Sequence, residues 1–251
     1  MKKLLLIGCI VFITSCQTAT PTPEIIILPT VTIPASPTPI PATETPEPTP
    51  TLEPTSTPLP QYFKATFDTS LAGWVILQAG NDAASHVSVE NNILRLQMDL
   101  PYTWFYALYS PFDYGNVHIE TEFINNALTP ASAGLICRYS EIDGWLEYNV
   151  STDGAYNVLY GRWLSAGIAD YLPVIDGVSI DVKQSGETQQ IGMTCSDTIL
   201  RLYVNGTIIR TVDVSSYELG KGKVGITASS YESTPVVVAI NWVTVSESIS
   251  P

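Results

Sequence analysis

The sequence predicts an all-β domain over residues 61–251, and three observations support this prediction. Short segments of alternating apolar and polar residues follow one another from Gln61 onward, as in half-buried strands. Gly, Asn, Asp and Pro separate these segments, and no segment has a convincing helical period. Many short strands at regular spacing indicate a single β-sandwich or barrel.

Residues 133–163 (AGLICRYSEIDGWLEYNVSTDGAYNVLYGRW) show this pattern most clearly. Asp143-Gly144 and Asp153-Gly154 predict two tight turns, because Asp and Gly tolerate the positive φ of hairpin turns. Three strands therefore lie here. Alternation places their side chains on two faces, one carrying Leu135, Cys137, Tyr139, Leu146, Tyr148 and Val150, and the other carrying Ile136, Arg138, Trp145, Glu147 and Asn149.

The other expected strands share the alternation and are also bounded by turn residues. They cover residues 64–67, 74–77, 86–90, 93–98, 104–109, 117–123, 189–195, 199–204, 207–212, 223–228 and 236–245. Asn91-Asn92 and Asn205-Gly206 each separate two of them by two residues, which predicts two further hairpins.

The first sixteen residues (MKKLLLIGCIVFITSC) have a basic start, an apolar run and small residues, as secretory signals do. The apolar run is shorter than the about 20 residues that a membrane-spanning helix needs. Its end, residues 13–16, resembles the lipobox of bacterial lipoproteins. That resemblance implies cleavage before Cys16, lipidation of Cys16 and anchoring to the extracellular face of the cell membrane. The alternative is an ordinary signal peptide with a chance cysteine.

Residues 17–60 are rich in Pro, Thr and Glu and contain most of the chain's 19 prolines. Proline at this density prevents helix and sheet formation and favours an extended chain. We therefore expect a disordered linker that holds the following domain away from the membrane.

Composition excludes some classes of partner. The formal net charge of −13 argues against nucleic-acid binding, which needs Lys and Arg to neutralise phosphates. Two histidines without a His/Cys cluster argue against a zinc site. We expect a monomer whose partners are a glycan or polysaccharide and the membrane.

Several motifs, in order, resemble the concanavalin A-like jelly-roll modules of bacterial surface proteins. The match opens with Phe67-Asp68 and Gly73-Trp74 and continues through residues 116–123, 134–138, 144–147, 153–154, 199–206 and 222–225. The resemblance covers nearly all of residues 62–247 and extends to laminin-G-like, pentraxin-like and 3-keto-disaccharide hydrolase domains. It implies a jelly-roll β-sandwich, and its motifs concern structure rather than activity.

Two cysteines, Cys137 and Cys195, remain after the N-terminal segment. Each cysteine shares a face of its strand with apolar residues, and disulfides persist in exported domains. We predict a disulfide between adjacent strands or across the core. The alternative is two buried free thiols.

The segment from Glu141 to Glu147 (EIDGWLE) invites comparison with family 16 glycoside hydrolases, which share the jelly roll and carry E-x-D-x-E or E-x-D-x-x-E on one strand. Here the spacing is one residue too long, and Asp143-Gly144 is the expected turn. The two glutamates would then lie on different strands, whereas a retaining enzyme needs carboxyls about 5–5.5 Å apart. This comparison argues against catalysis by these residues.

A carbohydrate-binding face is the favoured site hypothesis. If residues 117–123 neighbour the strand of Arg138, then one face carries Glu120 and Arg138 beside Trp145, Glu147 and Asn149. Charged and amide groups there could bond sugar hydroxyls, and tryptophans could stack on sugar rings. Trp104, Tyr106, Trp145 and Trp163 lie in or beside turns and outward-facing positions, where such rings could stack on sugars, and Trp104 completes the predicted set. The alternative for these aromatics is a place in the core. The alternative for the same face is a solvated surface with ion pairs.

The sequence thus favours a non-catalytic, lectin-like module over an enzyme. Alternatives are a glycoside-cleaving hydrolase of the 3-keto-disaccharide hydrolase type, whose arginine after a small-residue strand matches Arg138, and a structural or adhesion module. We expect no cofactor other than a structural calcium ion. Jelly rolls of this kind often hold one, and Asp68 and Asn241 occupy the first and last strands where it would bind.

Overall fold

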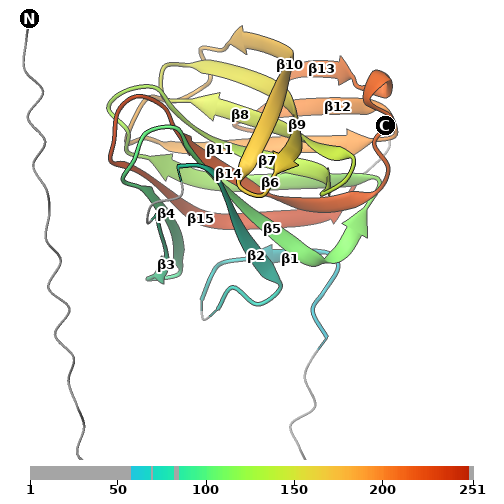
Figure 1. The fold of residues 1–251 in the computed structure, drawn as a ribbon, viewed down its shortest axis with the longest axis horizontal. Helices are drawn as coiled ribbons and strands as arrows, with labels where there is room; N and C mark the ends of the chain where they lie inside the picture. Colours follow the sequence, from blue (N-terminus) through green and yellow to red (C-terminus); the bar gives the residue numbers. More distant parts are fainter. Residues whose placement is uncertain (1–57, 69, 82–84, 249–251) are drawn as a thin grey trace, which may run out of the picture. The chain divides into compact units, whose positions relative to one another are not determined.

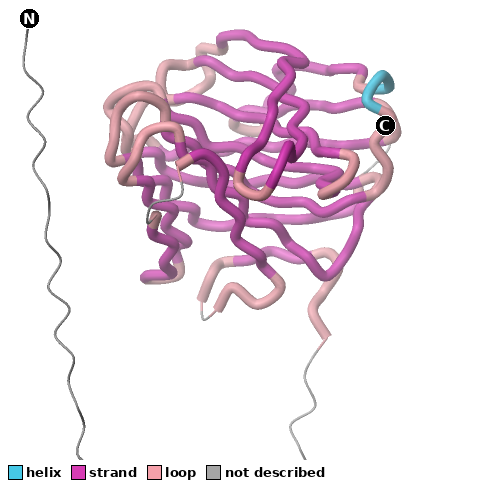
Figure 2. The backbone as a smooth tube through the Cα atoms, in the orientation of Figure 1, coloured by secondary structure: helices cyan, strands magenta, loops and turns pink. Residues whose placement is uncertain are grey.

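A computed structural model describes residues 58–68, 70–81 and 85–248. The predicted signal segment, Cys16 and nearly all of the predicted linker lie outside these residues. Within the described ranges, no helix is long and apolar enough to cross a membrane. The domain is a sandwich of two antiparallel sheets (Figure 1), as predicted. The helical content of the described ranges is one short 3-10 turn, η1 (Ser215–Tyr217), which Figure 2 shows in cyan.

The first sheet, called sheet A, has the strand order β13-β12-β11-β6-β15-β4-β3, with β1 paired to β15. Its strands are β1 (Phe63–Ala65), β3 (His86–Glu90), β4 (Ile93–Met98), β6 (Val117–Asn125), β11 (Thr188–Ser196), β12 (Ile199–Val204), β13 (Thr207–Asp213) and β15 (Val236–Glu247).

The second sheet, called sheet B, has the order β10-β9-β8-β7-β14-β5-β2. Its strands are β2 (Trp74–Gly80), β5 (Thr103–Tyr114), β7 (Ala131–Ser140), β8 (Gly144–Ser151), β9 (Ala155–Ser165), β10 (Ile168–Val178) and β14 (Gly222–Ser230).

Alternation along the strands builds the core between the sheets. In β6 every second residue is buried, from Val117 through Ile119 to Phe123, while the residues between them face outward. Hairpins form where the sequence predicts them. Asn91 and Asn92 both have positive φ (52° and 65°), which is the geometry of the tight turn that Asn favours.

A disulfide joins the two sheets through the core. Cys137 on β7 and Cys195 on β11 are fully buried and bonded, with their Cα atoms 6.7 Å apart. The predicted pairing is confirmed, and its partners lie in opposite sheets. It therefore cross-links the two layers of the sandwich.

One strand of sheet B was not expected from the sequence. β10 contains Asp170, Pro173 and Gly177, which are typical of loops. These residues are tolerated because β10 is the edge strand of sheet B, and the pairing with β9 shifts register between Pro173 and Ile175. In Figure 1, β10 crosses in front of the other strands.

The two edges of sheet B approach each other. The backbone N–H of Gly80, at the end of β2, donates to the carbonyl of Gly167 at the tip of the β9–β10 hairpin, at 3.0 Å. Tyr171 of β10 also packs on Trp104 of β5, with ring centroids 6.0 Å apart. Because the edges meet, the outer face of sheet B, which is turned away from sheet A, is concave and partly closed.

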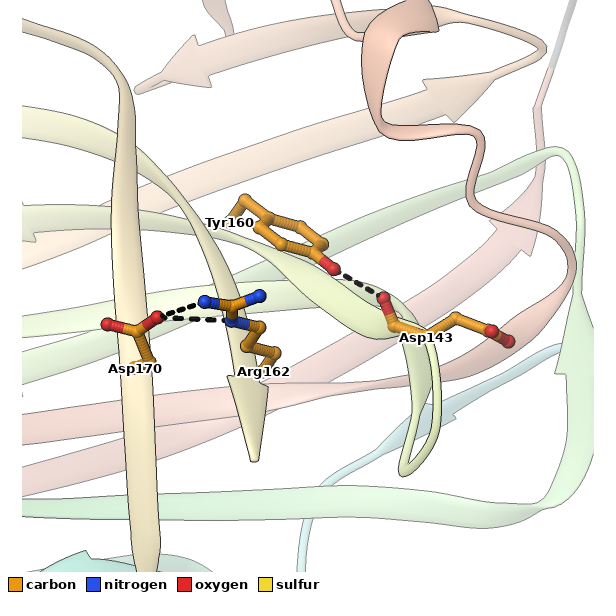
Figure 3. Close-up of polar contacts among 4 residues, drawn as sticks. All are labelled: Asp143, Tyr160, Arg162 and Asp170. Atoms are coloured by element: carbon orange, nitrogen blue, oxygen red, sulfur yellow. Dashed lines mark hydrogen bonds and ion pairs between the residues drawn. The ribbon is translucent and has the colours of Figure 1, made fainter. Parts of the chain in front are cut away.

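Polar contacts link β9 to its neighbours on both sides (Figure 3). Arg162 of β9 donates from Nε and Nη2 to one carboxylate oxygen of Asp170 on β10, at 3.0 and 2.8 Å. Tyr160 Oη donates to the carbonyl of Asp143 in the β7–β8 turn, at 2.7 Å. The first contact joins β9 to β10, and the second joins β9 to the turn before β8.

Candidate functional site

The concave face of sheet B carries a second apolar cluster, separate from the core between the sheets. We call it the aromatic cluster. Its rings come from five of the seven strands of sheet B and are Trp104, Tyr106, Tyr139, Trp145, Trp163 and Tyr171.

Trp145 lies at the centre of this cluster and is fully buried. Its ring is 5.3 Å from those of Tyr139 and Trp163 and 5.5 Å from that of Tyr106, measured between centroids. The indole lies over Gly161 of β9, where an added Cβ would stand 2.4 Å from the ring. Only glycine fits beneath Trp145, because a side chain at position 161 would collide with the indole. The missing side chain leaves the space that the large tryptophan ring fills.

A buried carboxylate lies on the same face. Glu147 is 1% exposed; its Oε2 accepts from Trp145 Nε1 at 3.0 Å and its Oε1 from Asn149 Nδ2 at 2.9 Å. Thr227 Oγ1 adds a longer contact at 3.5 Å. Burial raises the pKa of Glu147, and the three hydrogen bonds only partly oppose this rise. Glu147 is thus closed off from any ligand in this conformation.

The accessible part of the concave face is a groove made of two adjoining hollows of about 490 and 360 Å³. Both are lined by Leu77, Tyr139 and Glu141, so they adjoin each other. We call this surface the sheet B groove. The larger hollow is bordered by the half-buried ring of Trp163, whose Nε1 donates to Tyr139 Oη at 2.8 Å.

Charge is distributed unevenly along the sheet B groove. Glu141 lies where the hollows meet, and Lys221 and Lys223 line the smaller one. Lys223 Nζ pairs with Asp113 at 2.9 Å. The groove therefore offers an aromatic and apolar end beside Trp163 and a polar end that carries both signs of charge.

The sequence-predicted site is only partly assembled. Trp145, Glu147 and Asn149 share the concave face of sheet B, as their alternation predicts, and Trp104 borders the same cluster. The first three are buried, however, and bond to one another instead of facing solvent. They support the floor of the sheet B groove.

The prediction that Glu120 and Arg138 join this face is wrong. Glu120 lies on β6, which pairs with β11 and β15 in sheet A, and accepts from Gln190 Nε2 at 2.7 Å. Arg138 has a positive φ of 56° in a β-bulge, and its guanidinium donates to the carbonyls of Leu219 and Asp197. These two backbone acceptors make Arg138 a structural residue.

The same bulge explains two residues that sequence reasoning misplaced or missed. Because one residue is inserted in β7, Tyr139 joins Ile136 on the concave face instead of facing the core with Cys137. Tyr171 was missed with the whole of β10. No local signal in the sequence marks the bulge, whereas the alternation of residues 168–172 (IADYL) could have indicated the strand.

Two further expectations concern carboxylates and oxygen ligands. Glu141 lies in the turn between β7 and β8, so Glu141 and Glu147 are not on one strand, as expected. Asn241 donates from Nδ2 to Glu122 at 2.9 Å, and Asp68 lies in the loop after β1. Among the described residues, no group of three or more His, Cys, Asp or Glu is placed to hold a metal ion. A calcium ion at Asp68 and Asn241 stays a prediction.

Comparison with known proteins gives the fold. No family model matches the sequence, and no curated protein matches it. Among solved structures, a β-glucanase from Bacillus licheniformis superposes with a TM-score of 0.53 and 14% identity, over 74% of this chain and 98% of its own. A galectin-like protein of unknown function from Bacillus subtilis gives 0.56 and 10%, over 75% and 96%.

A third solved structure, the Crh5 transglycosylase, gives a TM-score of 0.54 and 10% identity, over 76% of this chain and 86% of its own. At these identities the match concerns the fold alone. Together with the two antiparallel sheets, it shows that this chain contains a jelly-roll β-sandwich of the concanavalin A-like type.

Proposed function

We propose that this domain binds a glycan chain, without cleaving it, in the sheet B groove. The observation that carries the proposal is the pairing of a partly accessible aromatic ring, Trp163, held by the buried Tyr139, with polar groups along two adjoining hollows. Sugar rings place apolar C–H faces on aromatic rings while their hydroxyls bond to polar side chains at the edge. Glu141, which lines both hollows, and Ser140, which lines the smaller one, supply such groups.

The shape of the groove favours a chain over a single sugar. Two hollows that adjoin at Leu77 and Tyr139 suit successive rings of an oligosaccharide. A rigid platform also limits the entropy lost on binding. Trp163 is held by its hydrogen bond to Tyr139 and by packing on Tyr106 and Trp145.

The fold neighbours support a ligand of this class. Two of them are described as a β-glucanase and a transglycosylase, and both superpose on this chain over most of their length. Their descriptions concern their own activities. They favour a carbohydrate ligand here because this chain presents its groove on the outer face of one sheet of the same fold.

The carboxylates favour binding over hydrolysis. A retaining glycosidase holds two carboxyl groups about 5–5.5 Å apart, on opposite sides of the scissile bond. In this chain Glu147 is buried beneath Trp145, and Asp113 is paired with Lys223. Among the described carboxylates that line the sheet B groove, this leaves Glu141 without a second carboxyl placed for catalysis.

The proposal includes the location of the domain. The predicted lipidation of Cys16 would anchor the chain to the extracellular face of the cell membrane, and the Pro/Thr-rich linker would hold the domain above it. A glycan-binding module on such a tether would meet polysaccharide outside the cell.

Affinity electrophoresis of the full chain against a panel of soluble polysaccharides tests the proposal. We expect retardation by at least one of them. Trp163→Ala should weaken that binding roughly tenfold, the loss expected for one aromatic stacking contact. Trp163→Phe should restore part of it. Trp242→Ala is the matched control, because Trp242 lies on sheet A beneath Lys64 Nζ, 4.4 Å from its ring centroid.

Three results would contradict the proposal. Unchanged retardation of a folded Trp163→Ala variant, judged by its melting temperature, would place the site elsewhere. Release of reducing sugar by the wild type would make the domain a hydrolase. Failure to bind any glycan in the panel would favour a structural or adhesion module.

A further inference from the structure

A third hollow, of about 330 Å³, lies on the outer face of sheet A, on the opposite side of the sandwich from the sheet B groove. We call it the sheet A pocket. Its lining comes from β6, β11, β12, β15 and the turn after β12, and consists of His118, Glu120, Thr194, Tyr203, Gly206, Ser246 and Glu247.

Strand register gathers these residues. Ser246, His118 and Thr194 lie opposite one another across β15, β6 and β11. In the neighbouring row, Gly192 of β11 stands between Glu120 and Tyr203. A Cβ on Gly192 would lie 3.3 Å from both the His118 ring and Tyr203, so the glycine leaves a depression between these two side chains.

Hydrogen bonds hold the floor of the sheet A pocket in one arrangement. His118 Nδ1 bonds Thr194 Oγ1 at 2.8 Å, and Thr194 Oγ1 bonds Tyr203 Oη at 3.3 Å. The His118 and Tyr203 rings meet edge to face, 5.3 Å apart and at 90°. Since Nδ1 is engaged, Nε2 is the ring nitrogen left to meet a ligand. Burial lowers the pKa of His118 although Glu120 opposes this, which favours a neutral imidazole.

The charge of the sheet A pocket is one-sided. Its lining includes the carboxylates of Glu120 and Glu247 and no Lys or Arg. Cations on the same face lie outside the lining. They include Lys64, whose ammonium sits over Trp242, Arg201 of β12, which lies opposite Thr194 of β11, and Arg95 of β4, which lies between the buried Leu94 and Leu96. A ligand that brings its own positive charge would therefore be favoured in the pocket.

We propose that the sheet A pocket binds an amino sugar in its ammonium form. The ammonium group would donate to Glu120 and Glu247, and the ring hydroxyls would bond His118 Nε2 and the Ser246 hydroxyl. A charged donor and several hydroxyls on one small ring match the chemistry of this lining. The inference is independent of glycan binding in the sheet B groove, because the two sites lie on different sheets.

NMR titration of the isotope-labelled full chain with glucosamine, N-acetylglucosamine and glucose, at matched ionic strength, tests the inference. We expect glucosamine to shift the amide signals of Tyr203, Gly206 and Ser246. N-acetylglucosamine and glucose, which lack the charge, should bind at least roughly tenfold more weakly, as should glucosamine to Glu120→Gln.

Glu122→Gln is the matched control. Glu122 lies on the same face of β6 two residues away and accepts from Asn241, outside the sheet A pocket. Its substitution should leave glucosamine binding unchanged. A Trp163→Ala variant should also bind glucosamine normally, which separates this site from the sheet B groove.

Several outcomes would overturn the inference. These are equal binding of the three sugars, shifts confined to the sheet B groove, or no shifts at all. If Nα-acetyl-lysine amide binds as tightly as glucosamine, the ring hydroxyls contribute nothing and the amino-sugar assignment is wrong. If Glu120→Gln and Glu122→Gln weaken glucosamine binding equally, the binding reflects the overall negative charge of the sheet A face and not a specific site.

Discussion

At the scale of single residues, burial decides what a polar side chain does. Glu147 and Glu141 are six positions apart, yet the first is sealed beneath Trp145 and the second lines the sheet B groove. A buried carboxylate with three donors is a structural element with a perturbed pKa, whereas an accessible one can meet a ligand.

The buried Glu147 predicts an unusual dependence of stability on pH. Its folded-state pKa is raised, so the folded protein holds the proton more tightly than the unfolded chain, whose glutamate titrates near pH 4.3. This contribution is complete below the unfolded pKa and is lost as pH rises through the folded pKa. The free energy of unfolding of wild type, minus that of Glu147→Gln, should therefore fall as the pH rises above about 4.

Urea denaturation of both proteins across this range measures that difference, and effects of other titrating groups cancel in it. Glutamine can be accommodated at position 147, because its new N–H donor finds an acceptor nearby. Asn149 Oδ1 has no hydrogen-bond partner in the described chain, and a rotation of the Asn149 side-chain amide would turn this oxygen toward position 147. A difference that grows with pH would show that Glu147 is stabilised as a charged group.

At the scale of strands, departures from regular alternation shape the site. The bulge at Arg138 turns Tyr139 onto the concave face, and β10 brings Tyr171 across it. The bulge sits beside the disulfide, since Cys137 immediately precedes Arg138 on β7. The cross-link thus secures the strand whose geometry forms the floor of the sheet B groove.

Removing the disulfide should destabilise the domain without changing its fold. In the chain-entropy view, closing a loop with a sequence separation of 58 residues contributes about 4 kcal/mol. The double variant Cys137→Ala, Cys195→Ala should lose a free energy of unfolding of this size in guanidinium denaturation. The reduced and alkylated wild type provides a comparison. A loss below about 1 kcal/mol would mean that the unfolded chain is constrained by other structure.

At the scale of the whole molecule, the sandwich presents two different outer faces. Sheet B carries an aromatic groove, and sheet A carries an acidic pocket with a hydrogen-bonded histidine. Their lining residues do not overlap, so each face can be altered separately.

Attachment of the whole chain to the membrane is predicted to depend on Cys16. If Cys16 is lipidated, the wild type should incorporate labelled palmitate and partition into the detergent phase of Triton X-114. Cys16→Ser should do neither, because no acyl chain can then be attached and the apolar run before it is too short to span a bilayer. A Cys16→Ser chain that is still labelled and membrane-bound would disprove this mode of anchoring.

The sequence by itself determined the architecture. Alternation and turn residues predict the strands from β1 to β9 and from β11 to β15, because each strand buries one side and each hairpin needs residues that accept positive φ. The pairing of Cys137 with Cys195 also follows, since both cysteines share a face of their strands with apolar residues and the domain is predicted to be exported, where disulfides persist.

Only the tertiary structure decided which side chains meet a ligand. Alternation assigns a residue to a face, but it does not say which sheet a strand joins, so Glu120 was placed beside Arg138 although it lies in sheet A. Nor does it say what covers a face. Trp145 is buried under rings from several strands, among them Tyr171 of β10, a strand that contains Pro173, and these contacts depend on residues distant in the chain. Accessibility arises from such long-range packing, which no local pattern encodes.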